Sequence, residues 1–142
     1  MLSNNDLPSE SVDYMKKQEL CIPVIRLEWS DWTEWDKIKN DAMGKNGVPI
    51  PNGKPGVYEA RLNDQEERLH IGKASNLRMR VRQGLVKGKI RHSTGDKIRK
   101  FENTSAILVR WAETDRPAAA EEELHRLHKE RFSGRLPKYT KH

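Results

Sequence analysis

The feature that most constrains the fold of this 142-residue chain is a pair of short alternating segments, residues 56–62 and 69–72. In the first segment Tyr58, Ala60 and Leu62 fall on one face, because successive side chains of a strand point to opposite sides. The second segment, LHIG, alternates in the same way, and the run NDQEE between them is too polar for anything but a hairpin loop. The two segments therefore predict a β-hairpin.

The rest of the chain adds helices and one more strand to this hairpin. Leu77 and Val81 lie one turn apart and would form the packing edge of a helix. Ala120, Leu124 and Leu127 would form the apolar stripe of the last helix. The further elements are expected in the order helix over 76–83, helical segment over 85–100, strand over 105–111 and helix beginning near Pro117. Three strands with flanking helices indicate an α+β domain.

The chain divides into an N-terminal extension (1–45) and a domain (46–142), with a loop rich in Gly and Pro where they meet. In the extension Trp29, Trp32 and Trp35 recur every three residues, which predicts a helix that packs its tryptophans on the domain or on a partner. Stacking of these rings on nucleic-acid bases is the alternative, although their acidic neighbours oppose contact with DNA.

The net charge of +6 is unevenly distributed. Residues 1–50 carry six Lys/Arg against nine Asp/Glu, whereas the stretch from Arg68 to Lys100 carries eleven Lys/Arg against one acid, Asp96. Ordinary solvated faces mix both signs, so this stretch is expected to face phosphates of DNA. The side chains assigned to DNA binding are Arg78, Arg82, Lys87, Lys89 and Arg91.

Cys21 is the single cysteine, so the chain can form neither an intramolecular disulfide nor a cysteine-based zinc site. Its N-terminus shows no apolar leader, and no apolar run approaches 18 residues. We therefore expect a cytoplasmic protein that is not embedded in a membrane.

The tripeptides GVY at 56–58 and HIG at 70–72, followed by KASNL and then Arg80, resemble the signature of the GIY-YIG nuclease family. The resemblance covers roughly residues 50–140. It implies a small three-stranded antiparallel sheet flanked by helices, and a Mg²⁺-dependent (or Mn²⁺-dependent) DNA endonuclease of the restriction, repair or mobile-element type.

The resemblance also implies a role for each site residue. Tyr58 would position or deprotonate the attacking water, Lys73 would favour the anionic form of the tyrosine or the water, and Arg80 would bind the scissile phosphate. A glutamate early in the last helix would be the sole protein ligand of the metal, with waters completing its coordination. Asn76, where the helix bearing Arg80 begins, would support the site.

Two positions depart from the family pattern. His70 stands where the family usually has its second tyrosine, and it is either a general base or a hydrogen-bonding substitute on the strand. Thr140 stands where the family often has an asparagine, and its hydroxyl can still donate and accept hydrogen bonds.

The metal ligand is a choice among Glu121, Glu122 and Glu123, which point about 100° apart on a helix. Glu121 stands three residues before Leu124, which matches the family spacing, whereas Glu123 lies slightly nearer the apolar stripe. Glu122 points away. We select Glu121, with Glu123 as the alternative, while all three could simply complement the helix N-terminus.

Two further readings stay open. His125 and His128 have the spacing of a zinc pair, but nothing completes the set, so surface or site-edge histidines are expected. The competing function is a nucleic-acid-binding module of the same fold that has lost cleavage. Because cutting both strands commonly needs two active sites, a homodimer assembled through residues 1–45 is a further hypothesis.

Overall fold

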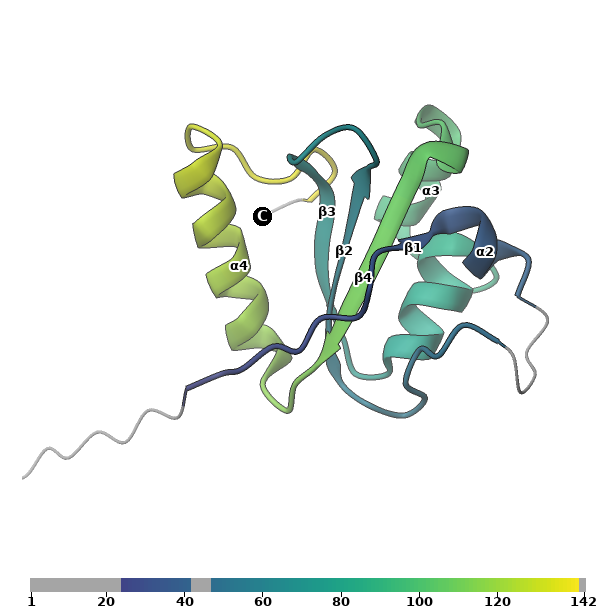
Figure 1. The fold of residues 1–142 in the computed structure, drawn as a ribbon, viewed down its shortest axis with the longest axis horizontal. Helices are drawn as coiled ribbons and strands as arrows, with labels where there is room; N and C mark the ends of the chain where they lie inside the picture. Colours follow the sequence, from purple (N-terminus) through teal and green to yellow (C-terminus); the bar gives the residue numbers. More distant parts are fainter. Residues whose placement is uncertain (1–23, 42–46, 141–142) are drawn as a thin grey trace, which may run out of the picture.

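The computed structural model describes residues 24–41 and 47–140, which form one antiparallel sheet with helices on both faces (Figure 1). The four strands are β1 (Thr33–Glu34), β2 (Gly56–Leu62), β3 (Arg68–Ala74) and β4 (Ile107–Glu113), in the spatial order β1-β4-β2-β3. The α+β class is thus confirmed. The sheet has one strand more than the expected three, because two residues of the N-terminal extension pair with β4.

The β2–β3 hairpin forms as predicted, with Tyr58 opposite Gly72 and Ala60 opposite His70. A shift of register between Ala60 and Arg61 then brings Arg61 opposite Arg68. β4 covers the other edge of β2 along its whole length. Among the strands that the structure describes, none lies beyond β3, which is the edge of the sheet at this end.

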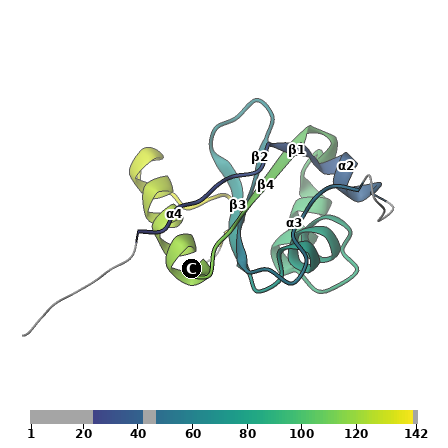
Figure 2. The same ribbon diagram turned by 60° about the horizontal axis from the view of Figure 1, so that its bottom comes forward.

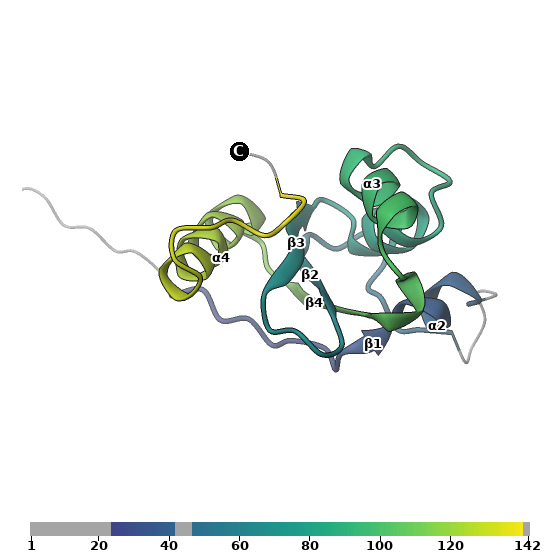
Figure 3. The same cartoon turned by 90° about the horizontal axis from the view of Figure 1, so that it is seen from above.

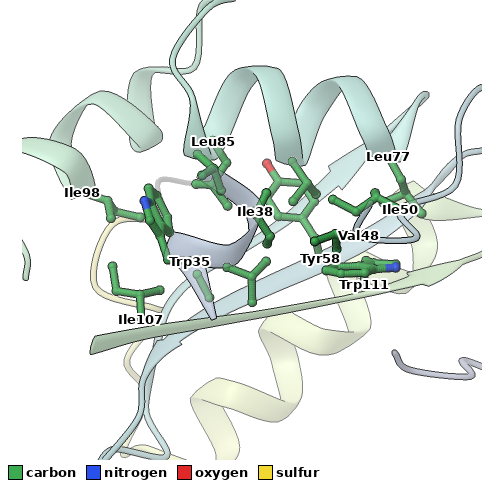
Figure 4. Close-up of a cluster of buried hydrophobic side chains, with 14 of the residues drawn as sticks. Trp35, Ile38, Val48, Ile50, Tyr58, Leu77, Leu85, Ile98, Ile107 and Trp111 are labelled. Atoms are coloured by element: carbon green, nitrogen blue, oxygen red, sulfur yellow. The ribbon is translucent and has the colours of Figure 1, made fainter. Parts of the chain in front are cut away.

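The main hydrophobic core fills one face of the sheet, beneath three helices (Figure 4). These are α2 (Trp35–Lys39), the π-helix η2 (Arg78–Val86) and α3 (Ser93–Phe101), which a short 3-10 turn, η3 (Thr104–Ala106), connects to β4. Leu77 and Val81 are fully buried, as their spacing predicted. The fully buried Ile38 and nearly buried Trp35 come from the extension, so the domain core begins before residue 45.

The opposite face is covered by the long helix α4 (Pro117–Arg131) and by the extended residues 24–32, as Figures 2 and 3 show. Val57, Ala112 and Ala120 form the small core there. Proline suits the first turn of α4, because the first backbone N–H groups of a helix have no intrahelical acceptor. The prediction that Tyr58 and Val57 lie on opposite faces of β2 is thus confirmed: Tyr58 belongs to the main core and Val57 to the small core beneath α4.

The tryptophan segment differs from the helix expected there. It is extended until β1, and helix begins only at Trp35. Trp29 and Trp32 stack on the guanidinium of Arg110, at 4.1 and 4.5 Å from their ring centroids. Arg61 and Arg68 also lie against Trp32. The buried carboxylate of Glu59 holds this cluster, because it pairs with both Arg68 and Arg110. Rings already stacked on arginines fit packing on the domain better than stacking on bases.

Residues 1–23, which include most of the predicted extension and Cys21, lie outside the described part of the chain. Among the described helices, none has the length and apolar character needed to cross a membrane.

Candidate active site

Tyr58 lies at the centre of the site, fully buried on the core-facing side of β2. Its hydroxyl oxygen is 2.8 Å from Nε2 of His92 and 3.3 Å from Nε2 of His70. The three rings meet edge to face, with centroids 5.4 to 6.1 Å apart. Both histidines are buried, so any hydrogen bond they make must be to protein groups nearby.

Gly72 permits this arrangement, because a larger residue would collide with it. A Cβ at position 72 would lie 2.6 Å from His70 Nε2 and 2.6 Å from the Tyr58 hydroxyl oxygen. Gly56 is equally confined, because its Cβ would lie 2.2 Å from the carbonyl oxygen of Ala112. The glycines of both tripeptides therefore have a packing explanation.

Hydrogen-bond partners fix the protonation of the three central groups. His92 is the N-cap of α3, and its Nδ1 accepts from the backbone N–H of Gly95 at 2.8 Å. Neutral His92 must therefore carry its proton on Nε2 and donate it to Tyr58. The Tyr58 hydroxyl then donates its own proton to Nε2 of His70. His70 consequently carries its proton on Nδ1 and donates to the hydroxyl of Thr140 at 2.9 Å.

Burial keeps these groups neutral. It raises the pKa of Tyr58 to about 12, although the charge and hydrogen bond of Arg80 act against that rise and the charge of Glu121 adds to it. Burial, assisted by His92 and Arg80, lowers the pKa of His70 to about 3. The pKa of His92 falls to about 4 for the same reason, with Arg80 and Arg99 contributing. Arg80 acts on all three groups, so it lies close to the whole cluster.

A cleft of about 880 Å³ opens over the free edge of β3, between α4 and the start of α3. Glu121, Lys73, His70 and Thr140 all line it. His125 holds its α4 wall in place, because Nε2 of its ring donates to the carbonyl oxygen of Ile71 at 3.1 Å. Of the predicted site residues, the cleft thus brings together His70, Lys73, Glu121 and Thr140. Tyr58 and Arg80 do not line it: Tyr58 lies behind His70, and Arg80 acts on Tyr58 through its charge and a hydrogen bond.

The three glutamates of α4 differ in their surroundings. Glu121 is half-buried, and in the described part of the chain it forms no ion pair. Glu122 is exposed and also lines the cleft. Glu123 is exposed and accepts from Nε of Arg126 at 3.0 Å, and this hydrogen bond lowers the pKa of Glu123. Glu121 is therefore the carboxylate best placed to bind a cation in the cleft.

The residues predicted to bind DNA divide into two groups. Lys89 and Arg91 are exposed. Arg82 differs from the expectation: its side chain is only 4% exposed, and it contacts Asp41. Nζ of Lys87 donates to the carbonyl oxygen of Asp41 at 2.8 Å. The face of η2 expected to meet phosphates thus partly packs on residue 41.

Two other predicted residues have structural contacts. Nε of Arg78 donates to the carbonyl oxygen of Ile50 at 2.9 Å. Asn76 supports the start of η2, because its Oδ1 accepts from the backbone N–H groups of Gly53 at 2.9 Å and Met79 at 3.4 Å. Both residues connect η2 to the loop that leads into β2.

His92 is the site residue that sequence reasoning missed. His92 gave no signal because it lies in a basic loop far from both tripeptides. The apolar stripe of α4 was also misjudged, since Leu127 is 46% exposed while His125 and His128 are buried. His128 continues the four-residue spacing of Ala120 and Leu124, which was a usable signal. Its Nε2 accepts from Arg68 N–H and its Nδ1 donates to the carbonyl oxygen of Arg135.

Within residues 24–41 and 47–140, no cluster of three or more His, Cys, Asp or Glu side chains could hold a metal ion. His125 and His128, which have the spacing of a zinc pair, therefore gain no third ligand among them. Comparisons of the chain with protein-family models, curated proteins and solved structures found no match.

Proposed function

We propose that this protein is a metal-dependent DNA endonuclease of the GIY-YIG type. The observation that carries the proposal is a half-buried glutamate, Glu121, in an open cleft that His70 also lines, with the buried Tyr58 hydrogen-bonded to His70 and Arg80 close to Tyr58. Arg80 and Glu121 both act on the charge state of Tyr58. These are the groups that phosphodiester hydrolysis needs: a proton acceptor, a cation for the phosphate and a ligand for a divalent metal.

The donor set fits Mg²⁺ or Mn²⁺. Mg²⁺ usually binds through one or two carboxylates and keeps several waters, and Glu121 offers one carboxylate facing an open cleft. Zinc would require three or four protein ligands. When bound, the metal would polarise the phosphate and stabilise the leaving oxygen.

The protein's own residues would position the substrate and move the proton. The guanidinium of Arg80 would hold the scissile phosphate, and the exposed ammonium of Lys73 adds positive charge to the cleft lined by Glu121. Because Tyr58 is fully buried, substrate binding would first have to admit the attacking water to its hydroxyl; Tyr58 would then accept a proton from that water as its own proton passes to Nε2 of His70. Donation from His92 stabilises the oxygen of Tyr58 while the proton moves.

The test is cleavage of supercoiled plasmid with Mg²⁺ or Mn²⁺. We expect Arg80→Ala and Glu121→Gln each to reduce nicking about 10²- to 10³-fold, the usual cost of losing one charge-stabilising group. Glu123→Gln is the matched control, since it removes the same charge two residues away and should leave nicking within about threefold. An active Glu121→Gln variant together with an inactive Glu123→Gln variant would show instead that Glu123 is the metal ligand.

The neutral resting state favours a second candidate, a nucleic-acid-binding module without cleavage. With the pKa of His70 at about 3, this histidine is not poised to accept a proton near neutral pH unless the substrate changes its surroundings. Salt-dependent DNA binding with no cutting of plasmid, branched or damaged DNA would support this candidate and overturn the nuclease.

We also propose that a duplex is cut by a homodimer, because each copy offers one such cleft. Sedimentation of the full chain and of a chain lacking residues 1–23, with and without DNA, tests this assembly. Monomers in every case would refute it.

A further inference from the structure

The edge of β3 is covered by the C-terminal residues 136–140, here called the strap. Figure 3 shows the chain crossing from the end of α4 to β3. The backbone N–H of Lys138 donates to the carbonyl oxygen of Arg68 at 3.1 Å, and that of Tyr139 donates to Leu69 at 2.8 Å. The strap thus hydrogen-bonds to the free edge of the sheet, directly before the HIG tripeptide.

A second attachment connects the strap to Glu102, the residue after α3. One carboxylate oxygen of Glu102 accepts from the hydroxyl of Tyr139 at 2.6 Å and from Nζ of Lys138 at 2.7 Å. The side chain of Glu102 is only 9% exposed, whereas that of Lys138 is 61% exposed. Glu102 is therefore a nearly buried anchor, and the strap is attached to both the sheet and the helical layer.

The strap ends at the active site. Thr140 directly follows the anchored Tyr139, and its hydroxyl accepts from Nδ1 of His70 and from the backbone N–H of Ile71 at 3.2 Å. Among the described residues, Thr140 is the partner of His70 Nδ1. A strap displaced from Glu102 would withdraw this partner and leave a buried N–H without an acceptor.

We propose that Glu102 is a positioning residue of the site: through Tyr139 it holds Thr140 against Nδ1 of His70, so that His70 keeps a free lone pair on Nε2 to receive the proton of Tyr58. The importance of the tautomer for cleavage rests on the proposed function. The control of the tautomer by the strap does not, because it follows from the hydrogen bonds alone.

Conservative variants separate this role from a general loss of folding. Tyr139→Phe removes only the hydroxyl that contacts Glu102, and Thr140→Val removes the acceptor itself. Arg135→Gln is the matched control: it breaks the 2.7 Å ion pair with Glu67 in the same C-terminal segment, but upstream of the strap.

The primary measurement is the ¹⁵N NMR spectrum of the His70 ring in the full-length protein near neutral pH, which distinguishes the two tautomers without any substrate. We expect the Nδ1–H form in the wild type. Tyr139→Phe and Thr140→Val should change the tautomer ratio about five- to tenfold toward Nε2–H, the size expected for losing one hydrogen bond. Arg135→Gln should leave the ratio unchanged.

An unchanged tautomer in Tyr139→Phe would overturn the proposal, and so would an equal change in Arg135→Gln. Where the wild type cuts DNA, kcat should fall in Tyr139→Phe with KM unchanged, because the strap does not touch the phosphate site. A protein that cuts no DNA would refute the nuclease instead, and the tautomer ratios would still decide the role of Glu102.

Discussion

Acid should destabilise this domain more than its composition suggests, because two buried histidines must stay neutral. The folded-state pKa values of His70 and His92, about 3 and about 4, lie well below the ordinary value of 6.5. Below pH 6.5 the unfolded chain therefore binds protons that the folded chain does not bind. Stability is fully present above pH 6.5 and is lost as the pH falls toward 4.

The size of the effect follows from proton linkage. Between pH 7.5 and pH 5 each histidine should remove about 2 kcal/mol from the free energy of unfolding, and the two together about 4 kcal/mol. The charges facing these rings are mainly those of Arg80, Arg99 and Asp96. Since the total free energy of unfolding of a domain is commonly about 5–15 kcal/mol, this loss should be easily measured.

Urea denaturation at pH 7.5 and pH 5.0 provides the assay, with His92→Asn as the comparison. Asparagine is a good N-cap, so it can keep the hydrogen bond to Gly95 without a titrating group. The variant should lose only about 2 kcal/mol over the same pH interval. A wild type that loses less than about 1 kcal/mol, or a variant that loses as much as the wild type, would refute the reasoning.

Two further substitutions test packing. Gly72→Ala should lower the free energy of unfolding by about 1–3 kcal/mol and abolish nicking, because its Cβ would collide with Tyr58 and His70. Gly84→Ala, whose Cβ would lie no closer than 3.3 Å to His92, should cost less, and equal losses in urea denaturation would contradict this account. Arg82→Ala should cost about 3–5 kcal/mol because it breaks a nearly buried ion pair with Asp41, yet should not change the salt dependence of DNA binding. Lys89→Ala removes an exposed cation. It should therefore leave the free energy of unfolding nearly unchanged in denaturation assays, but should reduce the salt dependence of DNA binding in binding assays.

Local patterns predicted much of the fold. The alternation in β2 identified both of its faces, and Pro117 marked the start of α4. The sequence did not indicate β1, because a two-residue strand is too short to show an alternating pattern. It also suggested a helix for the tryptophans, since their three-residue spacing gives no hint that arginines from three strands would stack on them.

The candidate site was predictable to the extent that its residues lie in or near the two tripeptides. Tyr58, His70 and Lys73 come from one hairpin, so their proximity follows from strand pairing. His92 lies 34 residues from Tyr58, and only the packing of α3 on the sheet brings the two together. Arg82 and Lys89 were both expected to face DNA, but Arg82 is buried and Lys89 exposed, because a strongly basic segment does not reveal which of its charges face solvent.

The two residues that depart from the pattern expected of the proposed family lie together in space. His70 and Thr140 lie 70 residues apart in the sequence, yet Nδ1 of His70 is 2.9 Å from the hydroxyl oxygen of Thr140. A tyrosine at position 70 would have a single oxygen to make all its polar contacts, whereas histidine accepts on one side of its ring and donates on the other. That second nitrogen needs a small acceptor close to the strand, and a threonine held by the strap supplies it. His70 and Thr140 therefore act as one hydrogen-bonded unit.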